Sequence, residues 1–188
     1  MEVKYYDWLD HHDDIRGDKI AIRDLDTKQD ISYRHLNRRA ASLAACLQSN
    51  GVKKGDRVAL LIRNCPAFFE VQFACSKIGA ICLPLNWRLT PNELSYILDD
   101  ATPCVLVHDL IFADTAPELA RACNIGLVLE VREPGEDSTY EQAMETKEDC
   151  TPVETTHDDV CMIMYTSGTT GHPKGAMITH GMVFYNIV

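Results

Sequence analysis

Apolar and polar residues form two kinds of segment through the middle of the chain. Four short, mostly apolar runs predict strands: Arg57–Ile62, Ile81–Pro84, Cys104–Val107 and Leu127–Val131. The segments between them predict helices, one from about Pro66 to just before Gly79, one from Thr90 to about Asp100, and one over Ala113–Cys123. Strands and helices that alternate over short connections are typical of βαβ units. We therefore expect an α/β fold with a mostly parallel sheet flanked by helices.

An amphipathic helix is predicted before the first of these strands. Its apolar positions recur at steps of three and four residues, at Leu36, Ala40, Leu43, Ala44 and Leu47. Ser32 is the expected cap at its beginning, and Gly51 provides the left-handed residue that often follows a helix. Two short strands, Lys19–Arg23 and Gln29–Ile31, precede it around a turn at Asp26-Thr27.

Two further helix beginnings carry capping signals. Asn64 is the expected cap of the helix that begins near Pro66. Thr90-Pro91-Asn92-Glu93 has the form of a capping box, with proline at the first helical position. The acidic segment 133–149 predicts a surface loop with about one helical turn around Gln142.

A loop rich in glycine and hydroxyl side chains lies near the end of the chain. The sequence over residues 165–175 is Tyr-Thr-Ser-Gly-Thr-Thr-Gly-His-Pro-Lys-Gly, between the apolar runs Val160–Met164 and Ala176–Thr179. Glycines permit positive φ, so successive N–H groups can converge on one point, and such a concave set of donors suits phosphate oxygens. Lys174 adds a mobile cation. The two apolar runs predict strands, so we expect this phosphate loop (165–175) to close a hairpin.

The loop differs from a Walker motif. Counting from Gly168, Pro173 stands where the second glycine is required, and Gly175 replaces the hydroxyl residue that would bind magnesium. An apolar segment follows in place of a helix. The plainer alternative is a solvent-exposed hairpin of glycine and threonine with no ligand.

The residues of this loop resemble the phosphate-loop signature of the adenylate-forming (AMP-binding) superfamily. That superfamily includes acyl-CoA synthetases, adenylation domains of peptide synthetases and firefly-type luciferases. The segments 55–59 and 84–100 resemble acyl-CoA synthetases in particular, although a turn and a capped helix explain those residues on physical grounds. The resemblance implies an ATP-dependent acid–CoA ligase, here acting on a fatty acid, that uses ATP, Mg²⁺ and CoA.

The same resemblance assigns roles to individual loop residues. It implies phosphate contacts by Thr166, Ser167, Gly168, Thr169, Thr170, Gly171 and Lys174. Lys174 would neutralise phosphate charge as the catalytic residue, while the hydroxyl groups would donate hydrogen bonds to the departing pyrophosphate.

The resemblance covers only the first part of the family's length. We therefore expect an N-terminal fragment in which residues 1–150 form an N-terminal α/β subdomain and residues 151–188 begin the next one. In relatives the adenine, ribose and magnesium sites and a catalytic lysine lie further along the chain. We expect this fragment to be inactive alone.

Composition narrows the partners and the compartment. The net charge is −10 without a basic block, so nucleic acid is not an expected partner. Eight cysteines without a C-x-x-C pair predict free thiols in a reducing compartment, and no apolar run is long enough to span a membrane. Cytoplasmic location is the prediction.

Several other polar residues are candidates for a functional site. The cluster His11-His12-Asp13-Asp14 is interpreted as a solvated helix end and not a metal site. His157, His172 and His180 are given structural roles, since a carboxylate substrate is already ionised and needs no base, and Asp158-Asp159 is interpreted as a turn at a strand entry. Three alternative functions stay open: a carrier-protein adenylation domain, a non-catalytic scaffold, and an unrelated phosphate-binding module with a conventional strand–loop–helix.

Overall fold

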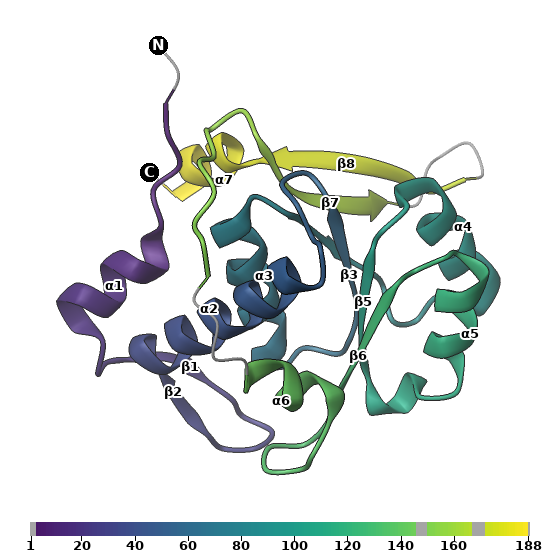
Figure 1. The fold of residues 1–188 in the computed structure, drawn as a ribbon, viewed down its shortest axis with the longest axis horizontal. Helices are drawn as coiled ribbons and strands as arrows, with labels where there is room; N and C mark the ends of the chain where they lie inside the picture. The colour runs from purple at the N-terminus through teal and green to yellow at the C-terminus, as the bar shows by residue number, and fades with distance from the viewer. Residues whose placement is uncertain (1–2, 146–149, 167–171, 188) are drawn as a thin grey trace.

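The computed structural model describes residues 3–145, 150–166 and 172–187, and its main feature is a six-stranded sheet between two helix layers (Figure 1). The strands are β3 (Arg57–Leu61), β4 (Ile81–Pro84), β5 (Val105–Asp109), β6 (Leu127–Val131), β7 (Val160–Thr166) and β8 (Lys174–Thr179). Their order across the sheet is β6-β5-β3-β4-β7-β8. Strands β6, β5, β3, β4 and β7 run parallel to one another, and β8 is antiparallel to β7. The predicted α/β fold with a mostly parallel sheet is confirmed.

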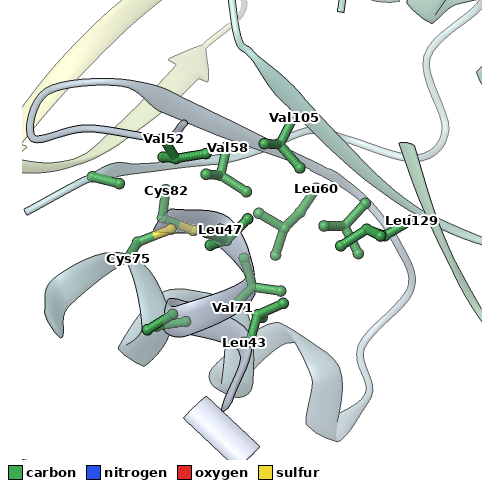
Figure 2. Packing of buried hydrophobic residues seen from close by; sticks show 14 of the residues in the cluster. Leu43, Leu47, Val52, Val58, Leu60, Val71, Cys75, Cys82, Val105 and Leu129 are labelled. Carbon is green, nitrogen blue, oxygen red and sulfur yellow. The ribbon is translucent and has the colours of Figure 1, made fainter. Parts of the chain in front are cut away.

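Alternate residues of the central strand face opposite helix layers. Val58 and Leu60 of β3 belong to one buried cluster, which includes residues of α2 (Tyr33–Ser49) and α3 (Pro66–Ile78). Ala59 and Leu61 belong to a second cluster, with α4 (Pro91–Ala101) and α5 (Thr115–Ala122). Figure 2 shows the first cluster, where side chains of α2 and α3 lie against the strands. A parallel sheet covered on both faces needs apolar residues at successive positions, which explains the continuous run that predicted β3.

Local capping signals account for most of the helix ends. The Ser32 hydroxyl accepts the His35 N–H at the beginning of α2. The capping box of α4 is confirmed: the Thr90 hydroxyl accepts the Glu93 N–H, and the Glu93 carboxylate accepts the Thr90 N–H at 2.8 Å. Gly79 ends α3 with φ of +68°, a left-handed conformation that suits glycine.

The prediction that Asn64 caps α3 is wrong. The capping position is Cys65, whose side chain makes no capping hydrogen bond. Pro66 occupies the first helical position, so the cap is the residue immediately before it. Proline also has no N–H, which leaves one donor fewer for a side-chain cap to satisfy.

The remaining helices follow the predicted pattern with shifted ends. The helix expected over Ala113–Cys123 is α5, preceded by a short 3-10 turn, η1 (Leu110–Phe112). The turn expected around Gln142 is α6 (Thr139–Met144). Two ion pairs of Arg39 connect α6 to the rest of the fold: Arg39 of α2 donates to the buried Glu70 of α3 at 2.5 Å and to the more exposed Glu141 of α6 at 2.7 Å. The Tyr140 hydroxyl donates to the same Glu70 carboxylate at 2.8 Å.

The N-terminal residues lie against the segment that leads into β7. The antiparallel strands β1 (Ile20–Arg23) and β2 (Asp30–Ser32) follow α1 (Trp8–Arg16), as expected. Ahead of α1, residues 3–5 form what we call the N-terminal strap. The Tyr5 N–H donates to the Thr155 carbonyl, and the His157 N–H donates to the Val3 carbonyl, both at 2.8 Å. The division into subdomains at residue 150 stays a prediction, although β7 continues the sheet beside β4.

Candidate functional site

The predicted hairpin at the end of the chain is confirmed. Strands β7 and β8 pair antiparallel, and their last two pairs are Tyr165 with Gly175 and Thr166 with Lys174. The predicted contacts Ser167, Gly168, Thr169, Thr170 and Gly171 lie outside the described residues. The alternative of a strand–loop–helix module is not supported, because β8 is a strand that pairs back onto β7.

Thr166 and Lys174 face each other at the mouth of the phosphate loop. Both residues are exposed, and directly opposed residues of an antiparallel pair present their side chains on the same face, about 4.5–5.5 Å apart at Cβ. Lys174 makes no ion pair with any residue in the described ranges. One hydroxyl and one ammonium group are therefore available together to an anion at this position.

Tyr165 joins the hairpin to α4. Its ring packs against the second apolar cluster, and its hydroxyl donates to the carboxylate of Asp100. Burial and this carboxylate raise the pKa of Tyr165, so the phenol stays protonated and remains a donor. Gly175 makes room for the ring, since a Cβ there would lie 2.9 Å from Ile163 Cγ2 and 3.1 Å from the Tyr165 ring.

His172 makes a second contact with the same helix. Its ring stacks on Tyr96 of α4, with centroids 4.9 Å apart and planes inclined by 23°. His172 is exposed, as predicted. Sequence reasoning gave Tyr96 and Asp100 only a place on a capped helix. The one available signal was their spacing of four residues, which puts them on the same helix face.

The other candidate residues have structural partners. The Asp159 carboxylate accepts the Thr156 N–H and pairs with Lys54, both at 2.7 Å, which confirms the predicted turn at the strand entry. His11 and His12 lie on α1, beside Tyr6 and Arg16 respectively. Among the described residues, no group of three or more His, Cys, Asp or Glu side chains is arranged to hold a metal.

His180 begins α7 (His180–Ile187), as predicted, and its ring is buried. The ring lies 4.1 Å from that of Tyr5 in the N-terminal strap, and Nε2 has no hydrogen-bond partner among the described residues. Burial lowers the pKa of His180 to about 4, so the imidazole is neutral at physiological pH.

Comparison with known proteins decides the family. The AMP-binding enzyme profile matches residues 9–188, which is nearly the whole chain. The chain belongs to the AMP-binding enzyme family. Feruloyl-CoA synthase of an Amycolatopsis species is 43% identical over 158 residues, which cover 84% of this chain and 30% of that protein. A long-chain-fatty-acid–CoA ligase of Mycobacterium tuberculosis is 39% identical over 157 residues, covering 81% and 30% respectively.

A solved structure agrees with the sequence comparison. The inhibitor-bound N-terminal domain of FACL13 from Mycobacterium tuberculosis superimposes with a TM-score of 0.83 at 32% identity, covering 95% of this chain and 45% of that one. This member of the AMP-binding family spans about 30% of the length of each of the two curated relatives. No described helix is both long and apolar enough to cross a membrane.

Proposed function

We propose that this chain is the part of an ATP-dependent acid–CoA ligase that binds the phosphates of ATP. In the complete reaction a substrate carboxylate attacks the α-phosphorus of ATP, the bond from that phosphorus to the bridging oxygen breaks, and pyrophosphate leaves. The thiol sulfur of CoA then attacks the acyl carbon of the adenylate, AMP leaves, and the thiol proton passes to solvent.

The observation that carries the proposal is the mouth of the hairpin. An exposed hydroxyl, Thr166, and an exposed ammonium, Lys174, are cross-strand partners at the two ends of a glycine- and hydroxyl-rich segment. Pyrophosphate gains charge as it departs, and donors fixed beforehand around that charge stabilise the transition state. The acidic chain repels a polyanion at long range, so binding depends on such local groups.

The expected substrate is a fatty acid. The similarity to the long-chain-fatty-acid–CoA ligase supports this choice. The similarity to feruloyl-CoA synthase favours an aromatic acid as the second candidate. Thioester formation with a long-chain acid and with ferulate, measured side by side in a protein that continues this chain to the length of its relatives, distinguishes the two.

Replacement of Lys174 by alanine tests the role of the loop. Loss of one charge-stabilising donor slows adenylation by about 10²–10³-fold in comparable sites, and acid binding should change little. The measurement is pyrophosphate exchange in the same extended protein. Lys53→Ala, at another exposed lysine, is the matched control. Unchanged exchange in Lys174→Ala would remove this lysine from the site.

The 188-residue chain alone is expected to be inactive. Hydrogen bonds to charged groups contribute about 1.5–3 kcal/mol each, and three of them supply about 5–9 kcal/mol. Association opposes this with about 4–15 kcal/mol, so affinity for ATP should be millimolar or weaker. Release of pyrophosphate by this chain with ATP and any carboxylic acid, above a heat-inactivated control, would contradict this expectation.

The cofactors follow from the proposed reaction, and the compartment follows from the cysteines. ATP and CoA are substrates, and magnesium would arrive with the nucleotide phosphates. Eight free thiols support a reducing compartment, for which we propose the cytoplasm.

A further inference from the structure

Helix α4 contacts both ends of the phosphate loop. Tyr165 lies just before the loop's undescribed residues and donates to Asp100, while His172 lies just after them and stacks on Tyr96. Figure 1 shows α4 near the end of the hairpin where β7 ends and β8 begins. Two separate contacts thus connect one helix to both sides of the loop.

The helix is firmly held. Its capping box fixes the beginning, and Leu94, Ile97, Leu98 and Ala101 are buried in the second apolar cluster. Tyr96 and Asp100 lie on the opposite, exposed side, one helical turn apart. The contacts to the hairpin therefore start from a part of the fold with little freedom to move.

The geometry of the strand separates these contacts from the ligand side. Successive side chains of a strand point to opposite faces, so Tyr165 faces α4 while its neighbour Thr166 faces away. Lys174 pairs with Thr166 and shares that other face. A residue that fixes the backbone at Tyr165 thereby fixes the direction of Thr166 and Lys174 without touching the ligand.

We propose that Tyr165 and His172 are positioning residues, which use Asp100 and Tyr96 of α4 to hold Thr166 and Lys174 in place before phosphate binds. The inference rests on the proposed function, because it takes a phosphate chain as the ligand of that face. Rigid placement in advance matters, since a donor that has to be ordered on binding gives up part of its interaction energy.

The negative charge of Asp100 distinguishes this role from phosphate binding. A carboxylate near bound phosphate weakens the affinity for phosphate. Asp100 therefore serves by accepting the hydrogen bond of Tyr165, and its negative charge does not help to bind phosphate. Asp100→Asn keeps an oxygen acceptor for Tyr165, whereas Asp100→Ala removes it. Asparagine should therefore preserve the hairpin, and phosphate affinity should be equal or higher.

The test measures backbone order and ligand binding separately in the full chain. Amide hydrogen exchange at Thr166, Lys174 and Gly175 reports on the hairpin without any ligand. Tyr165→Phe, which retains the ring, and Asp100→Ala should each accelerate exchange about tenfold, the equivalent of one lost hydrogen bond to a charged group. The double variant should be no faster than either single one, because both remove the same contact.

Control variants distinguish the loss of this hydrogen bond from a general loss of stability. Asp100→Asn should stay within about twofold of the original exchange rate, and so should Asp99→Ala, which removes the neighbouring carboxylate that lies beside Cys123. Tyr96→Ala should accelerate exchange about threefold, while Tyr96→Phe retains the stacked ring. Unchanged exchange in Tyr165→Phe would overturn the proposal.

Inorganic pyrophosphate is the ligand probe, titrated into the millimolar range and followed by the amide signals of Thr166 and Lys174. Tyr165→Phe should weaken binding about three- to tenfold. Faster exchange with unchanged pyrophosphate affinity would overturn the positioning role and leave the proposed function intact. If the original chain shifts no signal with pyrophosphate while Tyr165→Phe still exchanges faster, the proposed phosphate site fails and the positioning role fails with it.

Discussion

Replacing His180 with glutamine tests how a buried neutral imidazole couples folding to pH. His180 is 5% exposed, and Tyr5 and His157 lie beside its ring. Burial disfavours the charged form and is the main cause of its low pKa. Asp159 acts in the opposite direction, whereas His157 and Lys54 lower the pKa further.

The direction and size of this pH dependence follow from the pKa values of His180 in the folded and unfolded chain. His180 titrates at about 4 in the folded chain and near the ordinary 6.5 when unfolded. Between these two pH values the unfolded state binds more protons than the folded state. The contribution of neutral His180 to the stability of the folded chain is therefore full above pH 6.5 and is lost as pH falls toward 4. The total is about 3 kcal/mol, of which about 2 kcal/mol is lost between pH 7.5 and pH 5.

Urea unfolding at these two pH values, followed by tryptophan fluorescence, measures the effect. The free energy of unfolding of the original chain should fall by about 2 kcal/mol more than that of His180→Gln. His35→Gln, at an exposed histidine on α2, is the matched control. The reasoning fails if His180→Gln and the original chain lose stability equally, within about 0.5 kcal/mol.

Three further substitutions probe other contacts by the midpoint of urea unfolding. Glu70→Ala should destabilise by about 3 kcal/mol, because Arg39 loses one of its two carboxylate partners and the buried Tyr140 hydroxyl loses its acceptor; a change below about 1 kcal/mol would show that this carboxylate is dispensable. Gly175→Ala should cost about 1–3 kcal/mol, since the added Cβ meets Ile163 at 2.9 Å, and a neutral result would show that the hairpin adjusts freely. Thr90→Ala should cost about 1 kcal/mol through loss of the capping box, whereas Thr90→Ser should not.

The sequence predicted those features whose causes are local. Continuous apolar runs identified the buried strands, and the Thr90 capping box placed the beginning of α4, because each depends on residues a few positions apart. The same reasoning failed at Asn64, where the cap had to be the residue before Pro66. The hairpin was predictable since two apolar runs enclose a loop that cannot continue either strand.

Contacts between distant segments left no comparable signal. Nothing near Tyr165 in the sequence identifies Asp100 as its acceptor, and nothing near Arg39 identifies Glu70. Such pairs depend on how helices are placed over the sheet, which local patterns do not specify. The phosphate contacts were inferred from a motif, and of that set the structure describes only Thr166 and Lys174, whose role as phosphate contacts stays a prediction.

The N-terminal strap sets an order on folding. Lys4 bridges Thr156, so the strap finds its backbone partners in a segment that is synthesised much later. At roughly 5–20 residues per second, about 8–30 seconds of synthesis separate the two. The central strands and their helices can associate during that interval, whereas the strap and the start of β7 have to wait. The strap would therefore dock only after the strands and helices at the centre of the sheet have associated.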